Sequence, residues 1–132
     1  MNNKKILLVD DEKDTLLVLE KQLTTAGYTV VTANSGIQAL FLAKSERPDL
    51  IVLDLQMPDM DGGEVAHKLK EDSETKNIPV VYSTCLLSEN EDYRCGEKIM
   101  LAKSKDTKEL IAVIDKIVLH GGFTLQAYIE QL

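Results

Sequence analysis

Short apolar blocks alternate with longer amphipathic blocks along the chain, and this pattern predicts strands and helices in alternation. Runs rich in Val, Ile and Leu predict five strands, at residues 6–10, 28–33, 49–54, 78–84 and 98–103. The strands are apolar on both faces and are separated by helices. We therefore expect a doubly wound α/β fold, with a parallel five-stranded sheet covered on both sides.

The intervening blocks carry apolar residues at helical spacing. The positions expected to face the core are Leu16, Leu19, Leu23, Ala26, Ile37, Leu40, Ala43, Val65, Ala66, Leu69, Leu110, Val113, Ile114 and Ile117. Gly27 should end the first helix in a left-handed conformation, and Asn34 or Ser35 should cap the second. The third helix should open at Gly62, and the last one should begin near Asp106.

Length and charge narrow the class of protein. A chain of 132 residues is long enough for one core, and 22 acidic against 15 basic residues leave a net charge of -7. This charge argues against direct binding to nucleic acid or to an anionic membrane. The N-terminus has too few consecutive apolar residues for a signal peptide, so we expect a cytoplasmic protein. Cys85 and Cys95 have no zinc-type spacing and are expected to be reduced thiols.

Polar residues collect where the predicted strands end. Asp10 and Asp11 follow the first strand, Asp54 ends the third, Thr84 the fourth and Lys103 the fifth. Singly, each has a structural explanation, such as a helix cap for Asp11 or a solvated strand end for Lys103. Together they would bring three carboxylates to one sheet edge, where they repel one another unless a cation is present. Mg²⁺, or Mn²⁺, together with a phosphate group would suit such a site.

This grouping predicts phosphoryl chemistry. Asp54 would be the nucleophile, while the metal ion and Lys103 stabilise the phosphoryl oxygens and Thr84 bonds the resulting acyl phosphate. Two other functional classes are each excluded by one feature of the sequence. A haloacid-dehalogenase-like phosphatase needs an aspartate two residues after the nucleophile, where this chain has Gln56. A dinucleotide-binding site needs a glycine-rich loop, where this chain has DDEKD.

The motifs VDDE at 9–12 and LDLQMPDMDG at 53–62, with Thr84 and Lys103, resemble the receiver domain of bacterial response regulators in two-component signalling. The resemblance covers about residues 4–119 and implies a flavodoxin-like strand order 2-1-3-4-5. It implies that a sensor histidine kinase or a phosphotransfer protein phosphorylates Asp54. It also implies that Mg²⁺ binds Asp10, Asp11, Asp54 and the backbone carbonyl of Gln56. Such a domain assists its own phosphorylation and dephosphorylation but is not an enzyme in the usual sense.

The chain departs from that family in its second half. Met100 stands where the family commonly has an aromatic residue, Ser104 replaces the usual proline, and Cys85 replaces a smaller residue. Only eighteen residues separate Thr84 from Lys103, with little apolar periodicity, so we expect a short, irregular or missing fourth helix. The region that normally transmits the signal is therefore the most altered one.

We divide the chain into a receiver domain, 1–119, and a tail, 120–132. The tail spaces Leu125, Tyr128, Ile129 and Leu132 along one face of a short amphipathic helix, which should dock on its own domain or on a partner. With so short a tail we expect a stand-alone module that signals through an unknown downstream protein, or relays phosphate onward. Homodimerisation stays open. The alternative is a degenerate receiver that acts as an interaction module independent of phosphorylation.

Overall fold

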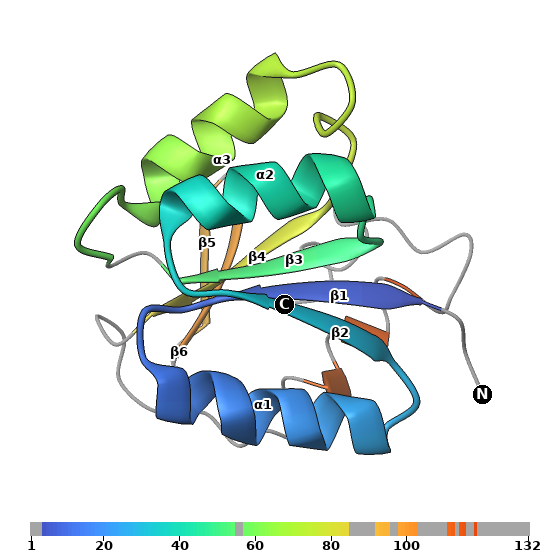
Figure 1. The fold of residues 1–132 in the computed structure, drawn as a ribbon. Coiled ribbons are helices and arrows are strands. Elements are labelled where there is room, and N and C mark those ends of the chain that lie inside the picture. The colour runs from blue at the N-terminus through green and yellow to red at the C-terminus, as the bar shows by residue number, and fades with distance from the viewer. Residues whose placement is uncertain are drawn as a thin grey trace.

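A computed structural model describes residues 4–54, 57–84, 92–95, 98–102, 111–112, 114–115 and 118. Up to residue 84, strands and helices alternate as the sequence predicts (Figure 1). In chain order they are β1 (Lys5–Val9), α1 (Lys13–Thr25), β2 (Thr29–Ala33), α2 (Gly36–Glu46), β3 (Leu50–Asp54), α3 (Gly62–Glu71), β4 (Val80–Thr84), β5 (Asp92–Cys95) and β6 (Lys98–Ala102). Residues 111, 112, 114, 115 and 118 are helical, within the last helix that the sequence predicts.

The strands form one sheet in the order β2-β1-β3-β4-β6-β5. The ladders from β2 to β6 are parallel, and β5 pairs antiparallel to β6 at the edge. The expected doubly wound parallel sheet is thus confirmed, with the five predicted strands in the order 2-1-3-4-5. The additional strand β5 lies in the segment where we expected a short or irregular fourth helix.

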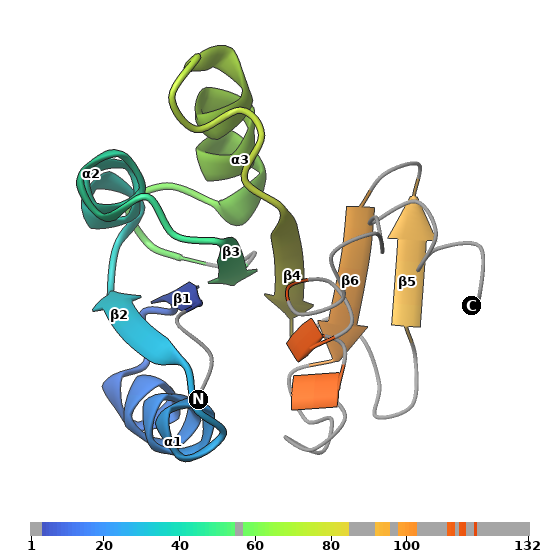
Figure 2. The same ribbon diagram turned by 90° about the vertical axis from the view of Figure 1, so that its right-hand side faces the viewer.

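Helices cover both faces of the sheet. In Figures 1 and 2, α2 and α3 lie on one face and α1 lies on the other. Successive side chains of a strand point to opposite faces, so the side chains of β1 are shared between two core clusters, one on each face. Ile6 and Leu8 join the core cluster that contains Leu16 and Leu23 of α1, together with Ile114.

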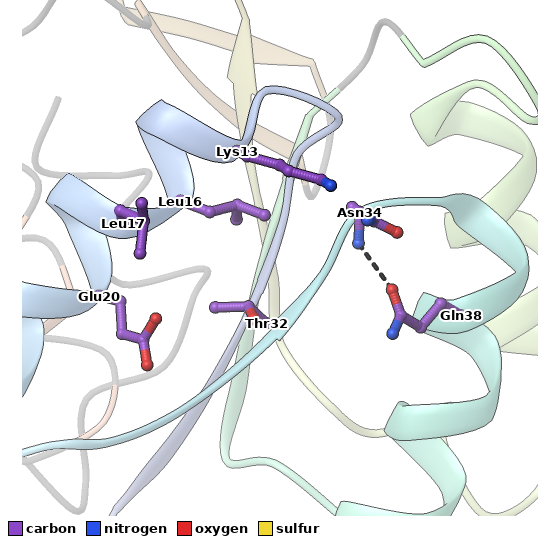
Figure 3. Close-up of a pocket in the computed structure, with 7 residues that line it drawn as sticks. All are labelled: Lys13, Leu16, Leu17, Glu20, Thr32, Asn34 and Gln38. Carbon is purple, nitrogen blue, oxygen red and sulfur yellow. Dashed lines mark hydrogen bonds between the residues drawn. The ribbon is translucent and has the colours of Figure 1, made fainter.

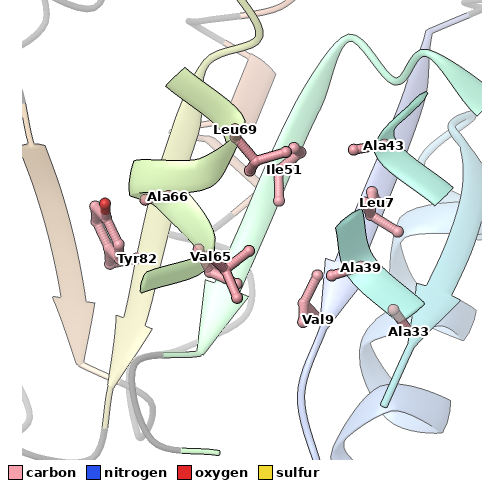
Figure 4. Close-up of a cluster of buried hydrophobic side chains, with 11 residues drawn as sticks. Leu7, Val9, Ala33, Ala39, Ala43, Ile51, Val65, Ala66, Leu69 and Tyr82 are labelled. Atoms are coloured by element: carbon pink, nitrogen blue, oxygen red, sulfur yellow. The ribbon is translucent and has the colours of Figure 1, made fainter. Parts of the chain in front are cut away.

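The second core cluster lies under α2 and α3 (Figure 4). Leu7 and Val9 of β1 contribute to it from the sheet. Its remaining buried members are Ala33, Ala39, Ala43, Ile51, Leu53, Val65, Ala66, Leu69 and Tyr82. Strand β3 contributes Leu50 and Val52 to the first cluster and Ile51 and Leu53 to the second. It is buried along its whole length, up to and including Asp54.

Among the described residues, most of the expected caps and core positions are correct, but two core positions are wrong. Leu110, Val113, Ile117, the expected helix start near Asp106 and the tail at 120–132 lie outside the described residues. Gly27 has φ 103°, Ser35 is the N-cap of α2, and α3 begins at Gly62. Ile37, however, is 68% exposed, and Ala26 is exposed at the end of α1. In α2 the buried residues are instead the small ones, Gly36, Ala39 and Ala43. Ala39 and Ala43 pack in the cluster with the sheet, whereas Gly36 lies against Met60 and Val65.

Candidate functional site

The acidic residues expected at the strand ends do come together. Asp54 is the last residue of β3, and Asp10 directly follows β1, its parallel neighbour. Val9 pairs with Leu53, so the next residue of each strand brings Asp10 beside Asp54. Asp10, Asp11 and Asp54 each offer one carboxylate oxygen, and these oxygens lie within 4.8 Å of one another.

Asp10 and Asp54 are both buried, and hydrogen bonds with the backbone also hold Asp10 in place. Asp54 is 1% exposed and Asp10 is 4% exposed, whereas Asp11 faces solvent. The Asp10 amide donates to the Ala33 carbonyl at 3.1 Å, and its Oδ1 accepts from the Glu12 amide at 2.9 Å. Glu12 is the N-cap of α1, so Asp11 does not take the capping position that was its structural alternative.

The donor set fits a hard divalent cation. Three carboxylate oxygens are ligands that Mg²⁺ accepts, and the ion usually keeps several waters beside them. Oxygens that bind one Mg²⁺ at about 2.1 Å lie about 3.0 Å apart when adjacent and about 4.2 Å apart when opposite, so the three aspartate oxygens, within 4.8 Å of one another, would move closer together around the ion. Asp10, Asp11 and Asp54 could therefore hold such an ion.

The other expected site residues can be followed only in part. Thr84 ends β4, one residue beyond Ser83, which pairs with Asp54, so its backbone reaches the same sheet edge. Thr84 also pairs with Ala102, the last residue of β6. Gln56, Lys103, Cys85 and Ser104 lie outside the described residues. The backbone of Met100 lies between Tyr82 of β4 and Tyr93 of β5 in the ladders.

The loop after Asp54 contains a contact that the sequence did not predict. The Asp59 carboxylate accepts the amides of Gly36 and Ile37 at the start of α2, at 3.0–3.2 Å. Donation by the Gly36 amide, followed by that of Ile37, lowers the pKa of Asp59, so this carboxyl stays ionised at neutral pH. Asp59 stands 23 residues after Gly36, and no local pattern could have indicated the pair.

An open pocket of about 280 Å³ lies between α1 and the end of β2 (Figure 3). Its lining is mixed, and none of the three aspartates contributes to it. The lining residues are Lys13, Leu16, Leu17, Glu20, Thr32, Asn34 and Gln38. On α3, the exposed side chain of His67 lies beside the Glu71 carboxylate.

The comparison with protein families identifies the chain. The family described as the response regulator receiver domain matches residues 6–115. The chain belongs to the response regulator receiver family. Accepting a phosphoryl group is general to this family, as are an acidic pocket that binds Mg²⁺ and interaction with histidine kinases or phosphotransfer proteins.

Individual relatives agree with this assignment. The receiver is 42% identical over 115 residues to the response regulator PleD of Caulobacter vibrioides, across 87% of this chain and 24% of that protein. It is 49% identical over 69 residues to the alkaline phosphatase synthesis transcriptional regulatory protein PhoP of Bacillus subtilis, across 52% of this chain and 29% of that protein. It thus spans less than a third of the length of either relative.

Solved structures share the fold over nearly all of the receiver. Chemotaxis protein CheY4 of Vibrio cholerae is 26% identical with a TM-score of 0.73, and the match covers 88% of this chain and 99% of that one. The receiver domain of Francisella response regulator 1452 is 27% identical with a TM-score of 0.72, covering 86% and 94%. In the described part of this receiver, every helix is too short or too polar to span a bilayer.

Proposed function

We propose that Asp54 accepts a phosphoryl group in a Mg²⁺-dependent reaction and that the domain then signals through protein–protein contacts. The observation that carries this proposal is the convergence of Asp10, Asp11 and Asp54 at the carboxyl edge of the sheet. Ligands of doubly wound sheets bind at this edge. Burial of two of these three carboxylates, in a site of hard oxygen donors, supports a metal-assisted reaction over simple helix capping.

In the proposed reaction, an Asp54 carboxylate oxygen attacks the phosphorus of the donor, and the donor's leaving group departs with the electron pair of the broken bond. Asp10, Asp11, Asp54 and the Gln56 carbonyl would hold Mg²⁺, which when bound neutralises charge on the phosphoryl oxygens. The Lys103 ammonium would pair with one of these oxygens, and the Thr84 hydroxyl would donate a hydrogen bond to another. The product is an acyl phosphate on Asp54.

The proposed partners follow from this chemistry. A sensor histidine kinase or a phosphotransfer protein would supply the phosphoryl group in the cytoplasm, and an unidentified downstream protein would bind the phosphorylated receiver. The net charge of -7 supports a protein partner over nucleic acid. We propose residues 1–119 as the receiver and 120–132 as the tail that docks on it or on a partner.

A second function, a constitutive interaction module, is favoured by one specific observation. Between β4 and β6, where receivers of this family normally have a fourth helix, this chain has the strand β5. The backbone of β5 extends the sheet and pairs with that of Met100. A sheet edge in this place presents a different surface to partners. Under this second function, partner binding would not depend on the phosphorylation of Asp54.

The decisive experiment is phosphorylation by acetyl phosphate, followed by intact mass with and without Mg²⁺. We expect one added phosphoryl group in the wild type with Mg²⁺, and none in Asp54→Asn, because the amide is a far weaker nucleophile than the carboxylate. Asp49→Asn is the matched control. Asp49 precedes the other end of β3 and is exposed, so its replacement should leave the gain in mass unchanged.

Two outcomes would count against the proposal. A wild type that gains no mass, although Mg²⁺ binding is confirmed by calorimetry, would make the constitutive interaction module the better function. A phosphoryl group that also appears in Asp54→Asn would place the modification on another residue.

A further inference from the structure

The first turn of α2 has backbone amides that its own sequence does not satisfy. The first amides of a helix have no partner within the helix and need another acceptor. Ser35, the N-cap, accepts only the Gln38 amide through its hydroxyl at 3.2 Å. The Gln38 side chain turns back to accept the Asn34 amide at 2.9 Å (Figure 3). The amides of Gly36 and Ile37 are left for an acceptor from elsewhere.

Asp59 supplies that acceptor from the loop that follows Asp54. Its Oδ2 accepts both amides, from Gly36 at 3.0 Å and from Ile37 at 3.2 Å, while Oδ1 also lies 3.1 Å from the Gly36 amide. The positive end of the α2 dipole favours a negative charge at this place. One carboxylate thus fastens the loop to a helix that precedes it by more than twenty residues.

The residue after Asp59 reinforces the same contact. Met60 packs against the α2 and α3 core cluster, and a Cβ added to Gly36 would lie 2.7 Å from the Met60 Cβ. The backbone of the loop therefore approaches α2 as closely as a glycine allows. One residue further on, Asp61 caps α3 by accepting the Glu64 amide at 2.9 Å.

We propose that Asp59 is a positioning residue for the phosphoryl acceptor site. Its bonds to α2 hold the loop after Asp54 in the conformation that Mg²⁺ binding and phosphorylation require. Met57, where the described part of this loop begins, comes only three residues after Asp54 in the sequence, so the contact to α2 restrains the chain close to the phosphoryl acceptor. This inference rests on the proposed function, because it assigns Asp59 to support of the same site.

Asp59→Ala tests this role through the initial rate of phosphorylation by acetyl phosphate, measured by intact mass over a series of Mg²⁺ concentrations. We expect the rate to fall, or the half-saturating Mg²⁺ concentration to rise, by about tenfold, as for other residues that orient metal ligands. Asp59→Asn should stay within about threefold of the wild type, because a single amide oxygen can replace Oδ2 and accept both α2 amides.

Asp61→Ala is the matched control. It removes an aspartate from the same loop and an N-cap from a helix, but leaves the contact to α2 intact. We expect its rate to stay within about threefold of the wild type once both proteins are assayed well below their melting temperatures. The amide signals of Gly36 and Ile37, followed by NMR, should shift in Asp59→Ala and stay near their wild-type positions in Asp61→Ala.

The outcomes separate this inference from the proposed function. If the wild type is not phosphorylated, both fail. If the wild type is phosphorylated and Asp59→Ala matches it, only the positioning role is overturned. If the phosphorylation rate falls equally in Asp59→Ala and Asp61→Ala, the cause is a general loosening of the loop, and the specific role of Asp59 is overturned. Equal losses in Asp59→Ala and Asp59→Asn would assign the effect to charge, and a faster Asp59→Ala would show that this charge repels the donor.

Discussion

Gly36 lies where the first turn of α2 meets the loop that follows Asp54. Its φ is not in the left-handed region, so its backbone conformation does not require glycine. The requirement comes from space, because an added Cβ would lie 2.7 Å from the Met60 Cβ and 3.0 Å from Val65 Cγ2. The sequence predicted a helix start here but gave no sign that this position lacks room.

Gly36→Ala should therefore destabilise the receiver, although alanine is normally the better helix residue. We expect a loss of about 1–3 kcal/mol in the free energy of unfolding, the usual range for overpacking, measured by urea denaturation. Gly63→Ala is the control with the milder contact, since its Cβ would lie 3.1 Å from Asp61 Oδ1, a side-chain oxygen that can shift. Its loss of stability should not exceed about 1 kcal/mol, the usual contribution of the helix cap that this oxygen makes. Equal stability of the two variants would contradict the close approach.

At the scale of elements, one side-chain bond joins the start of β2 to the last helix. Tyr28 precedes β2 and is 3% exposed, and its hydroxyl donates to the carboxylate of Asp115, a helical residue 87 positions later. Burial, the bond to Asp115 and the negative charge of Asp115 all raise the pKa of the Tyr28 phenol above its ordinary value. The neutral phenol is therefore the form that the folded state favours.

This shift predicts how stability depends on pH. A raised pKa in the folded state gives stability that is complete below the unfolded pKa of about 10 and is lost as the pH rises above it, at about 1.4 kcal/mol per pH unit. Tyr28→Phe should be about 1 kcal/mol less stable than the wild type at neutral pH, because Asp115 loses a donor. The two stabilities, measured by urea unfolding, should converge between about pH 10 and pH 11.

Neutral pH is the reference condition for both proteins, because the raised pKa values of Tyr28 and Tyr82 keep these two phenols protonated there. Burial also raises the pKa of Tyr82, so both proteins should lose some stability in alkali, and the difference between them isolates Tyr28. Curves that stay parallel from neutral pH to about pH 11 would contradict the pKa shift assigned to Tyr28.

The face that α2 presents to the sheet differs from the one that the sequence pattern predicted. Helix α2 carries apolar residues on more than one side, and the sequence pattern favoured Ile37 as a core residue. The folded helix presents Ala39 and Ala43 to the sheet and leaves Ile37 and Phe41 exposed at 68% and 69%. Small residues allow α2 to lie close to β1, an advantage that hydrophobic periodicity alone does not express.

At the scale of the whole molecule, three carboxylates at the ends of two strands of the described sheet lie within 4.8 Å of one another at one edge. Mg²⁺ that binds only the folded state should raise the free energy of unfolding, by about 2.7 kcal/mol at a hundred times the dissociation constant. In EDTA, Asp54→Asn should be more stable than the wild type by about 1–3 kcal/mol, because one of three neighbouring charges is removed. Mg²⁺ should raise the free energy of unfolding of Asp54→Asn by less than that of the wild type.

Urea unfolding in EDTA and in Mg²⁺ measures both effects. Asp49→Asn, at the opposite end of β3, should show neither the stabilisation in EDTA nor the smaller gain from Mg²⁺. A wild type that is equally stable in EDTA and in saturating Mg²⁺ would contradict a metal site formed by these aspartates. Asp54→Asn that is no more stable than the wild type in EDTA would show that their mutual repulsion is already relieved within the fold.

The sequence by itself determined the α/β class, the five parallel strands and the convergence of Asp10, Asp11 and Asp54. These features follow from local periodicity and from polar residues that end buried strands, because parallel strands bring their carboxyl ends to one edge. Only the tertiary structure decided that Ala39 rather than Ile37 faces the sheet, that β5 pairs with β6, and that Asp59 fastens its loop to α2. Each of these depends on which distant backbone lies within bonding distance, and that distance is set by the packing of the whole chain rather than by any local stretch of it.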